Sequence, residues 1–220
     1  MKVRLFASLA LALPLAFTSF QANAGEAGFD YQVLATAQPK ETKAKVEIIE
    51  FFSYRCPHCF QLEPSLKAWI AKQPASVKVI RQPVIFSDKW EASARAYYAL
   101  EATGSLEKVH LKVFEAMHEQ GFNFDDPAVF FDWAGKQGLD ANKLRDAYDS
   151  FSTSSKIARA KQLAQSYKLE GVPTLAVNGK YLTSASMTGS TPAMYATLDE
   201  LVRKELGKGA KATTAKPVKK

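Results

Sequence analysis

Cysteine is scarce in this chain of 220 residues, which holds only Cys56 and Cys59. A closed structural zinc site needs four ligands, and the chain has just three histidines to add. Two of them, His110 and His118, fall in a predicted helical region, where we expect ordinary helix residues. Covalent haem attachment needs a histidine directly after the second cysteine, and Phe60 stands there instead. We therefore expect neither a metal site nor a haem.

Long apolar segments are also scarce, and beyond the N-terminus none is long enough to cross a membrane. Residues 1–24 have the pattern of a secretory signal peptide, with two basic residues, an apolar core over 5–17 and an Ala-Asn-Ala cleavage site at 22–24. A transmembrane anchor is the weaker alternative, because the apolar run is short and contains Pro14. A lipoprotein anchor needs a cysteine at the cleavage site, and there is no cysteine near it. We expect an exported, soluble chain that starts at Gly25.

The net charge of +7 comes from the two ends of the chain. Two positive charges belong to the predicted signal peptide, and five lysines follow Glu205 with no acid among them. Residues 25–206 are therefore neutral, which argues against a nucleic-acid-binding domain. We predict that residues 207–220 form a flexible Lys-rich tail. A weak contact of this tail with an anionic membrane surface is the alternative.

The two cysteines stand in a strand–motif–helix context. The apolar run over 46–52 predicts a strand buried on both faces, and Cys56-Pro57-His58-Cys59 follows it closely. Apolar residues at helical spacing after the motif predict a helix over 57–72. This context predicts a redox site. A structural disulfide is the alternative, but a bridge across two residues constrains little of the unfolded chain.

Pro57 suits the first position of this helix, which places Cys56 at or next to its N-cap. The sulfur would then face unpaired backbone N–H groups and the positive end of the helix dipole. Both favour a thiolate, so we expect a lowered pKa for Cys56. Cys59 falls one turn later, on a side that we expect to be covered. We predict that Cys56 is the attacked, exposed sulfur and that Cys59 is its partner.

The remaining pattern predicts an α/β frame interrupted by helices. Strands are expected at 31–34, 77–84, 174–177 and 180–183, and a final helix at 191–207. Five helices are expected between Trp90 and Tyr167, two of them with Asp126 and Asp140 as N-caps. The sequence thus predicts a helical insertion at about 86–170 within one domain over 25–206.

Two motifs resemble those of the DsbA family of bacterial thiol:disulfide oxidases. They are Glu-Phe-Phe-Ser-Tyr-Arg-Cys-Pro-His-Cys at 50–59 and Gly-Val-Pro-Thr-Leu-Ala-Val-Asn-Gly-Lys-Tyr at 171–181. The resemblance implies a thioredoxin fold with an inserted helical subdomain, and a Cys56–Cys59 disulfide that is donated to exported proteins in the periplasm. It also implies reoxidation by a quinone-linked membrane partner of the DsbB type. No bound cofactor is expected, since the cysteines carry the electrons, and we expect a monomer.

The resemblance extends to residues around the cysteines. It implies that Pro173 is a cis proline beside the disulfide, that the Val172 backbone pairs with a client strand, and that Thr174 lines the same surface. Glu50 is a candidate acceptor for the Cys59 proton. The family pairs this glutamate with a lysine, but Arg81 stands at the matching place and would hold Glu50 ionised. A structural ion pair is therefore the alternative for Glu50.

Two basic residues stand next to the cysteines: Arg55 directly precedes the first, and His58 lies between the two. His58 is expected to stabilise the Cys56 thiolate by charge or by N–H donation, and the alternative is an inert surface histidine. Arg55 either adds positive potential near the thiolate or points into solvent.

Two other functions remain open for the same cysteines. A reductant or isomerase could share the fold, although isomerases usually carry an added N-terminal dimerisation domain, for which the short stretch before the strand at 46–52 leaves no room. A metallochaperone could bind Cu(I) through both thiols, but no Met-rich or additional cysteine site supports it.

Overall fold

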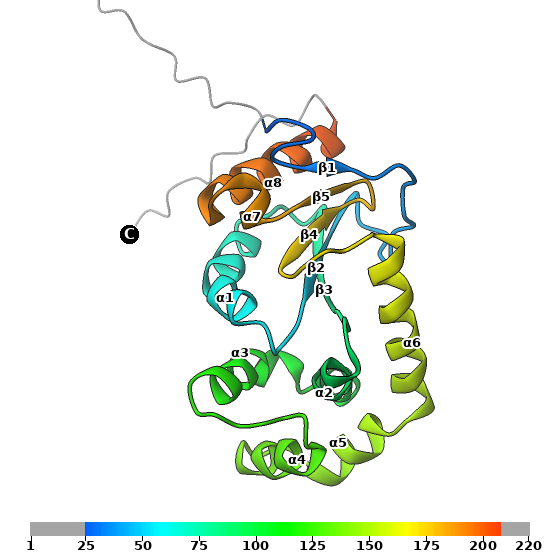
Figure 1. Ribbon diagram of the computed structural model, residues 1–220, viewed down its shortest axis with the longest axis vertical. Coiled ribbons are helices and arrows are strands. Elements are labelled where there is room, and N and C mark those ends of the chain that lie inside the picture. The colour runs from blue at the N-terminus through cyan, green and yellow to red at the C-terminus, as the bar shows by residue number, and fades with distance from the viewer. Residues whose placement is uncertain (1–24, 208–220) are drawn as a thin grey trace, which may run out of the picture.

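The computed structural model describes residues 25–207, which are coloured in Figure 1. The predicted signal peptide, 1–24, and residues 208–220 of the predicted tail lie outside the described residues. Within 25–207, no helix combines the length and the apolar character needed to span a bilayer.

A five-stranded mixed sheet forms the upper half of the molecule in Figure 1. Its strands are β1 (Gln32–Val33), β2 (Val46–Phe52), β3 (Val77–Pro83), β4 (Thr174–Val177) and β5 (Tyr181–Thr183). Their spatial order is β1-β5-β4-β2-β3, with β2 parallel to β3 and antiparallel to β4. All seven residues of β2 are buried, as its apolar run predicts. The strand that leads to the cysteines therefore lies inside the sheet.

Successive side chains of β2 contact different helices, because they point to opposite faces of the sheet. Ile48 packs with α1 (Pro57–Ile70) and α8 (Thr191–Leu206) on one face. Ile49 packs with the C-terminal part of α6 (Phe151–Ser166) on the other. Both faces of the sheet are thus covered by helices (Figure 1).

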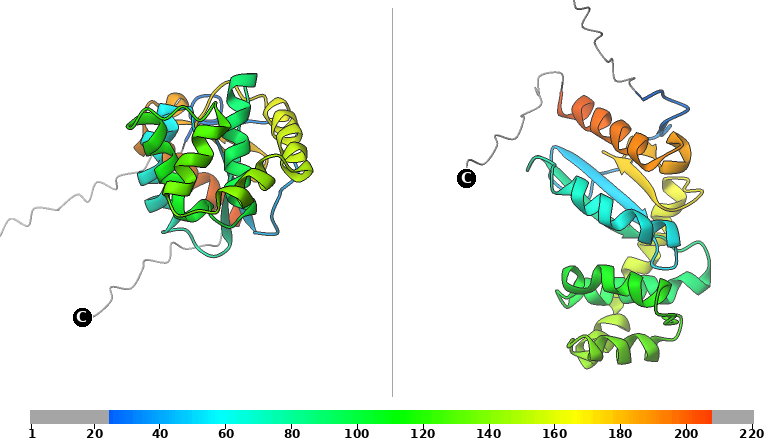
Figure 2. Two further views of the ribbon diagram at one scale, coloured as in Figure 1. Left: turned by 90° about the horizontal axis from the view of Figure 1, so that it is seen from below. Right: turned by 90° about the vertical axis from the view of Figure 1, so that its left-hand side faces the viewer.

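The predicted insertion lies between β3 and β4 and forms a separate helical layer at one end of the sheet (Figure 2). The insertion comprises the 3-10 helix η1 (Asp88–Trp90) and the helices α2 (Glu91–Ala102), α3 (Leu106–His118), α4 (Pro127–Lys136), α5 (Ala141–Tyr148) and α6, whose C-terminal part extends back over one face of the sheet. Its core contains the buried aromatic residues Phe114, Phe124, Phe130 and Trp133. The helix α3 packs against α1, so this layer reaches the active-site helix.

Short polar side chains set the helix ends. Asp126 and Asp140 cap α4 and α5, as predicted. Ser150 Oγ accepts the Thr153 N–H and caps α6, which begins at Phe151. A short helix that the sequence did not predict, α7 (Ala185–Thr188), begins after the N-cap Ser184.

Candidate active site

Cys56 is the N-cap of α1, and its extended backbone (φ −93°, ψ 113°) precedes Pro57 in the first helical position. The Cys59 backbone N–H donates to Cys56 Sγ at 3.4 Å. Cys56 is 8% exposed and Cys59 is 0% exposed, and both are free thiols. The predicted order of accessibility is correct, although only a small part of Cys56 reaches solvent.

The two sulfurs have opposite pKa shifts. A hydrogen bond from the Cys59 thiol is the main cause that lowers the pKa of Cys56 to about 6, and the backbone N–H groups of Cys59 and His58 add to it against the effect of burial. Burial raises the pKa of Cys59 well above its ordinary value. Cys56 therefore ionises first and alone near neutral pH, as a nucleophile or leaving group at this position must.

The imidazole of His58 is exposed, and its Nδ1 lies 3.3 Å from Gln61 Oε1. Its charge is the smallest of the causes that lower the Cys56 pKa, and its backbone N–H contributes more. Stabilisation of the thiolate by the His58 side chain stays a prediction. The hydrogen bond from the Cys59 thiol lowers the Cys56 pKa most, and the backbone N–H groups at the helix N-terminus lower it next.

The loop before β4 lies against Cys56. The Val172–Pro173 peptide bond is cis, as the resemblance implies, and the Cys56 thiol donates to the Val172 carbonyl at 3.3 Å. Thr174 begins β4, and its hydroxyl donates to the Gly171 carbonyl at 2.8 Å. The prediction that this loop, distant in the sequence, lies beside the first cysteine is therefore correct.

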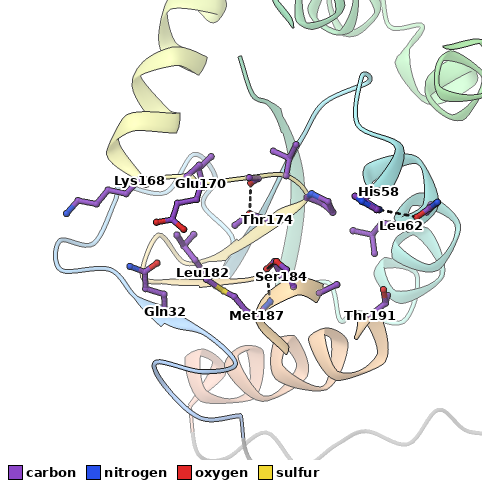
Figure 3. Close-up of a pocket in the computed structure, with 17 residues that line it drawn as sticks. Gln32, His58, Leu62, Lys168, Glu170, Thr174, Leu182, Ser184, Met187 and Thr191 are labelled. Carbon is purple, nitrogen blue, oxygen red and sulfur yellow. Dashed lines mark hydrogen bonds between the residues drawn. The ribbon is translucent and has the colours of Figure 1, made fainter. Parts of the chain in front are cut away.

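A pocket of about 500 Å³ opens beside this loop. Figure 3 shows His58 and Leu62 of α1 at one side of the pocket and Lys168 and Glu170 at the other, with Thr174 between them and Met187 of α7 below. The helix that the sequence did not predict thus forms part of the pocket next to the cysteines.

Glu50 lies near the C-terminal end of β2, fully buried and directly opposite Arg81 on β3. Arg81 Nε is 3.2 Å from Glu50 Oε2, but its hydrogen bonds go to Glu63 Oε1 and Oε2 at 3.2 and 3.1 Å. Burial and the Glu63 charge raise the pKa of Glu50 to about 8 despite the guanidinium. The expectation that Arg81 holds Glu50 ionised does not match this geometry, because Arg81 is bound to a second carboxylate.

His110 is not the ordinary helix residue that we expected. It is buried, with Nε2 at 2.9 Å from Glu63 Oε1 and Nδ1 at 2.7 Å from the Tyr54 hydroxyl. Burial lowers the pKa of His110, whereas the hydrogen bond from His110 is the main cause that holds the pKa of Glu63 below its ordinary value against the opposing effect of burial. A neutral imidazole then donates from Nε2 to Glu63 and accepts the Tyr54 hydroxyl at Nδ1.

His118 also contacts the active-site turn. Its Nε2 lies 2.8 Å from the Tyr54 carbonyl oxygen, and its ring stacks on Phe60. His110, Phe114 and His118 are spaced by four residues, so one face of α3 presents all three to α1. This spacing was a signal that could have identified both histidines from the sequence.

Arg55 forms an ion pair with Asp125 of the α3–α4 connection. Its charge is thus matched by a carboxylate, which weakens the interpretation of Arg55 as a source of positive potential at Cys56. The pair joins the active-site turn to the helical layer.

The chain is similar in sequence and in fold to known proteins. A family model described as the DSBA-like thioredoxin domain matches residues 86–194. The thiol:disulfide interchange protein DsbA of Burkholderia cepacia is 39% identical over 203 residues, which are 91% of this chain and 96% of that protein. This chain belongs to the DsbA family. The crystal structure of Pseudomonas aeruginosa DsbA has a TM-score of 0.80 and 34% identity, covering 84% of this chain and 96% of that one.

A second DsbA structure, from Xylella fastidiosa, has a TM-score of 0.78 and 26% identity over 84% of this chain and 99% of that one. The thioredoxin fold with an inserted helical subdomain is therefore confirmed, together with the family. As a member of the DsbA family, the chain is a thiol:disulfide oxidoreductase whose Cys56-Pro57-His58-Cys59 motif is its redox centre.

Proposed function

We propose that this DsbA family member introduces disulfides into exported proteins in the periplasm, with the Cys56–Cys59 disulfide as the group that it donates. The position of Cys56 at the N-cap of α1 carries this proposal. A lowered Cys56 pKa stabilises the reduced form, because the thiolate exists only after the disulfide has been given away. A stable reduced form makes the oxidised form a good oxidant.

The exchange proceeds in two displacements. A client thiolate attacks Cys56 Sγ, forms a mixed disulfide and breaks the Cys56–Cys59 bond, so Cys59 leaves and takes up a proton. A second client thiolate then attacks the client sulfur of the mixed disulfide and releases Cys56 as a thiolate. Two electrons have moved from the client to this protein, and the client holds the new disulfide.

Glu50 fits the proton step at Cys59. Its carboxyl group has a pKa near 8 and both of its oxygens lack a hydrogen-bond partner among the described residues. A group that titrates near ambient pH can give a proton and take it back. Its charge also helps to raise the pKa of Cys59, so the two groups interact. Glu50 would supply the proton during donation and accept it during reoxidation.

The Val172 carbonyl supports a role for the cis-proline loop in client binding. It accepts the Cys56 S–H in the reduced, protonated site. In the disulfide or the thiolate, Cys56 has no proton to donate, which leaves this carbonyl for a backbone N–H of an extended client segment. Thr174 follows in β4 and would line the same surface.

Oxidative refolding tests this function. A reduced, unfolded client with two cysteines is mixed with the oxidised protein at neutral pH, and client disulfide and active client are followed with time. We expect one client disulfide per Cys56–Cys59 disulfide consumed. Neither the Cys56→Ser variant nor the Cys59→Ser variant should oxidise the client, because neither has a disulfide to donate. A protein that instead reduces disulfide-bonded clients would contradict the proposal.

Continued turnover needs an oxidant for the reduced pair. We propose a quinone-linked membrane protein of the DsbB type, and a monomeric state for this chain. Membranes with and without such a partner, supplied with quinone, test this step through the rate at which the reduced form disappears. Sedimentation of the mature chain tests the monomer.

A further inference from the structure

The start of the described chain is seated on α8, on the side of the molecule away from the cysteines (Figure 1). The Gly25 backbone nitrogen lies 2.5 Å from Oε2 of Glu200, which is half-buried. A β-carbon added to Gly25 would lie 3.2 Å from both Cγ2 and Oγ1 of Thr197. The first residue is therefore held close to the helix, with a carboxylate on its nitrogen.

The residues that follow Gly25 in the chain hold its nitrogen in this position. Asp30 donates its backbone N–H to the Glu26 carbonyl and accepts the Glu26 N–H at Oδ2, both at 2.8 Å. The Thr183 hydroxyl donates to the Asp30 carbonyl at 2.8 Å, which ties the turn to β5. Tyr31 then packs edge-on against Tyr181 of β5, with ring centroids 5.7 Å apart. The nitrogen is thus placed by a turn that is anchored to the sheet.

The other charged groups near this end have different partners. Asp199 accepts the Trp69 indole N–H, and Glu205 pairs with Lys180. The Lys204 ammonium lies over the Tyr31 and Tyr181 rings rather than beside Glu200. Glu200 on α8 is therefore the carboxylate that contacts the Gly25 nitrogen, while the Asp30 carboxylate accepts the next N–H along the chain, that of Glu26.

We propose that Glu200 is a docking site for the α-amino group that forms when the leader is cleaved after Ala24; this rests on the proposed export of the chain. Water hydrolyses the Ala24–Gly25 peptide bond, leaving a carboxylate on Ala24 and an amine on Gly25 that takes up a proton. A neutral amide N–H thereby becomes an ammonium beside a half-buried carboxylate. A first residue larger than glycine would press on the Thr197 side chain, which would have to shift by a few tenths of an ångström.

The ion pair predicts a pH dependence with a definite sign. An α-amino group has an ordinary pKa of about 7.7–8.0, and a carboxylate beside it raises that value. The docked amine therefore stabilises the processed chain below its ordinary pKa, and the stabilisation is lost as pH rises through the raised value. An unprocessed chain has no such amine to titrate.

The test compares a chain that begins at Gly25, released from a fusion without extra residues, with one that retains Ala24. The α-amino pKa is measured by NMR of ¹⁵N-labelled protein. We expect it to be raised by at least about half a unit over an unfolded reference, and the Gly25 chain to melt about 2–4 °C higher at pH 7. Both effects should be lost in Glu200→Gln and kept in Glu119→Gln, which removes an exposed carboxylate on the helical layer.

An ordinary native α-amino pKa that Glu200→Gln does not change would overturn the proposal, as would equal melting of the Gly25 and Ala24 chains. If Glu200→Gln folds poorly, the Ala24 comparison and the amine pKa of Glu200→Asp decide the question. The mass of the exported protein is measured separately. Cleavage at another bond would overturn the docking and leave disulfide donation untouched, whereas a protein without oxidase activity could still show the raised amine pKa.

Discussion

The reduced protein should gain stability over the oxidised protein as pH rises from 5 to 8. Only the reduced form has the Cys56 thiol, whose pKa falls to about 6 in the folded chain from an ordinary value of 9.0. A lowered pKa gives stability that is fully present above the unfolded value and is lost as pH falls through the folded value. The stability that the Cys56 thiolate gives the reduced protein should therefore begin to rise near pH 6.

The magnitude follows from the two pKa values. Linkage gives almost no contribution at pH 5, about 1.4 kcal/mol at pH 7 and about 2.7 kcal/mol at pH 8. Above both pKa values the limit is about 4 kcal/mol, which equals about 90 mV for a two-electron couple. Glu50 is present in both redox forms, so its own titration largely cancels in the difference.

Urea denaturation of both forms at several pH values measures this difference. The oxidised sample is kept free of thiols and the reduced sample contains excess dithiothreitol. The difference in unfolding free energy should rise by about 2.6 kcal/mol between pH 5 and pH 8. The Cys56→Ser variant is the matched control, since it lacks the titrating sulfur. The pH dependence of its unfolding free energy should match that of the oxidised protein. A difference that stays constant, or falls with pH, would refute thiolate stabilisation at Cys56.

Three further substitutions test other parts of the account. His58→Ser should raise the pKa of the active-site thiolate slightly, because the backbone N–H remains; an unchanged absorbance titration at 240 nm would assign the whole shift to the Cys59 thiol and the helix terminus. Glu63→Gln removes a charge that raises the pKa of Glu50, so that pKa should fall below 8, and a carboxyl NMR titration that does not move would exclude the coupling. Gly179→Ala puts a β-carbon 2.1 Å from a backbone carbonyl oxygen at φ +64°, and should lower the free energy of urea unfolding by more than about 2 kcal/mol. Gly121 also has a positive φ but has open space around it, so Gly121→Ala should cost only about 1 kcal/mol. Equal losses for the two variants would contradict the close approach at Gly179.

Local patterns were enough to predict the frame of the fold. The continuous apolar run of β2, the proline after Cys56 and the aspartate caps of α4 and α5 each determine structure through neighbouring residues, and each prediction is confirmed. The short helix α7 was not predicted, because four residues give no apolar period to detect. Its consequence is local but functional, since Met187 lines the pocket beside the cysteines.

The buried polar network could not be predicted from sequence spacing alone. Pairing of Glu50 with Arg81 follows from the strand register, and that contact is present at 3.2 Å. The competing partner, Glu63, comes from α1, and His110 reaches it from α3 across the boundary with the helical layer. Which carboxylate takes the hydrogen bonds of Arg81 depends on this packing of three elements. The raised pKa of Glu50 is therefore a property of the tertiary structure.

The reduction potential of the Cys56–Cys59 pair tests the central claim most directly. The protein is equilibrated with glutathione buffers at pH 7, and the reduced fraction is read by thiol alkylation and mass. A potential well above that of the glutathione couple is the predicted result, because the Cys56 thiolate stabilises the reduced form. A value near that of thioredoxin, about −270 mV, would contradict the account and make this protein a reductant.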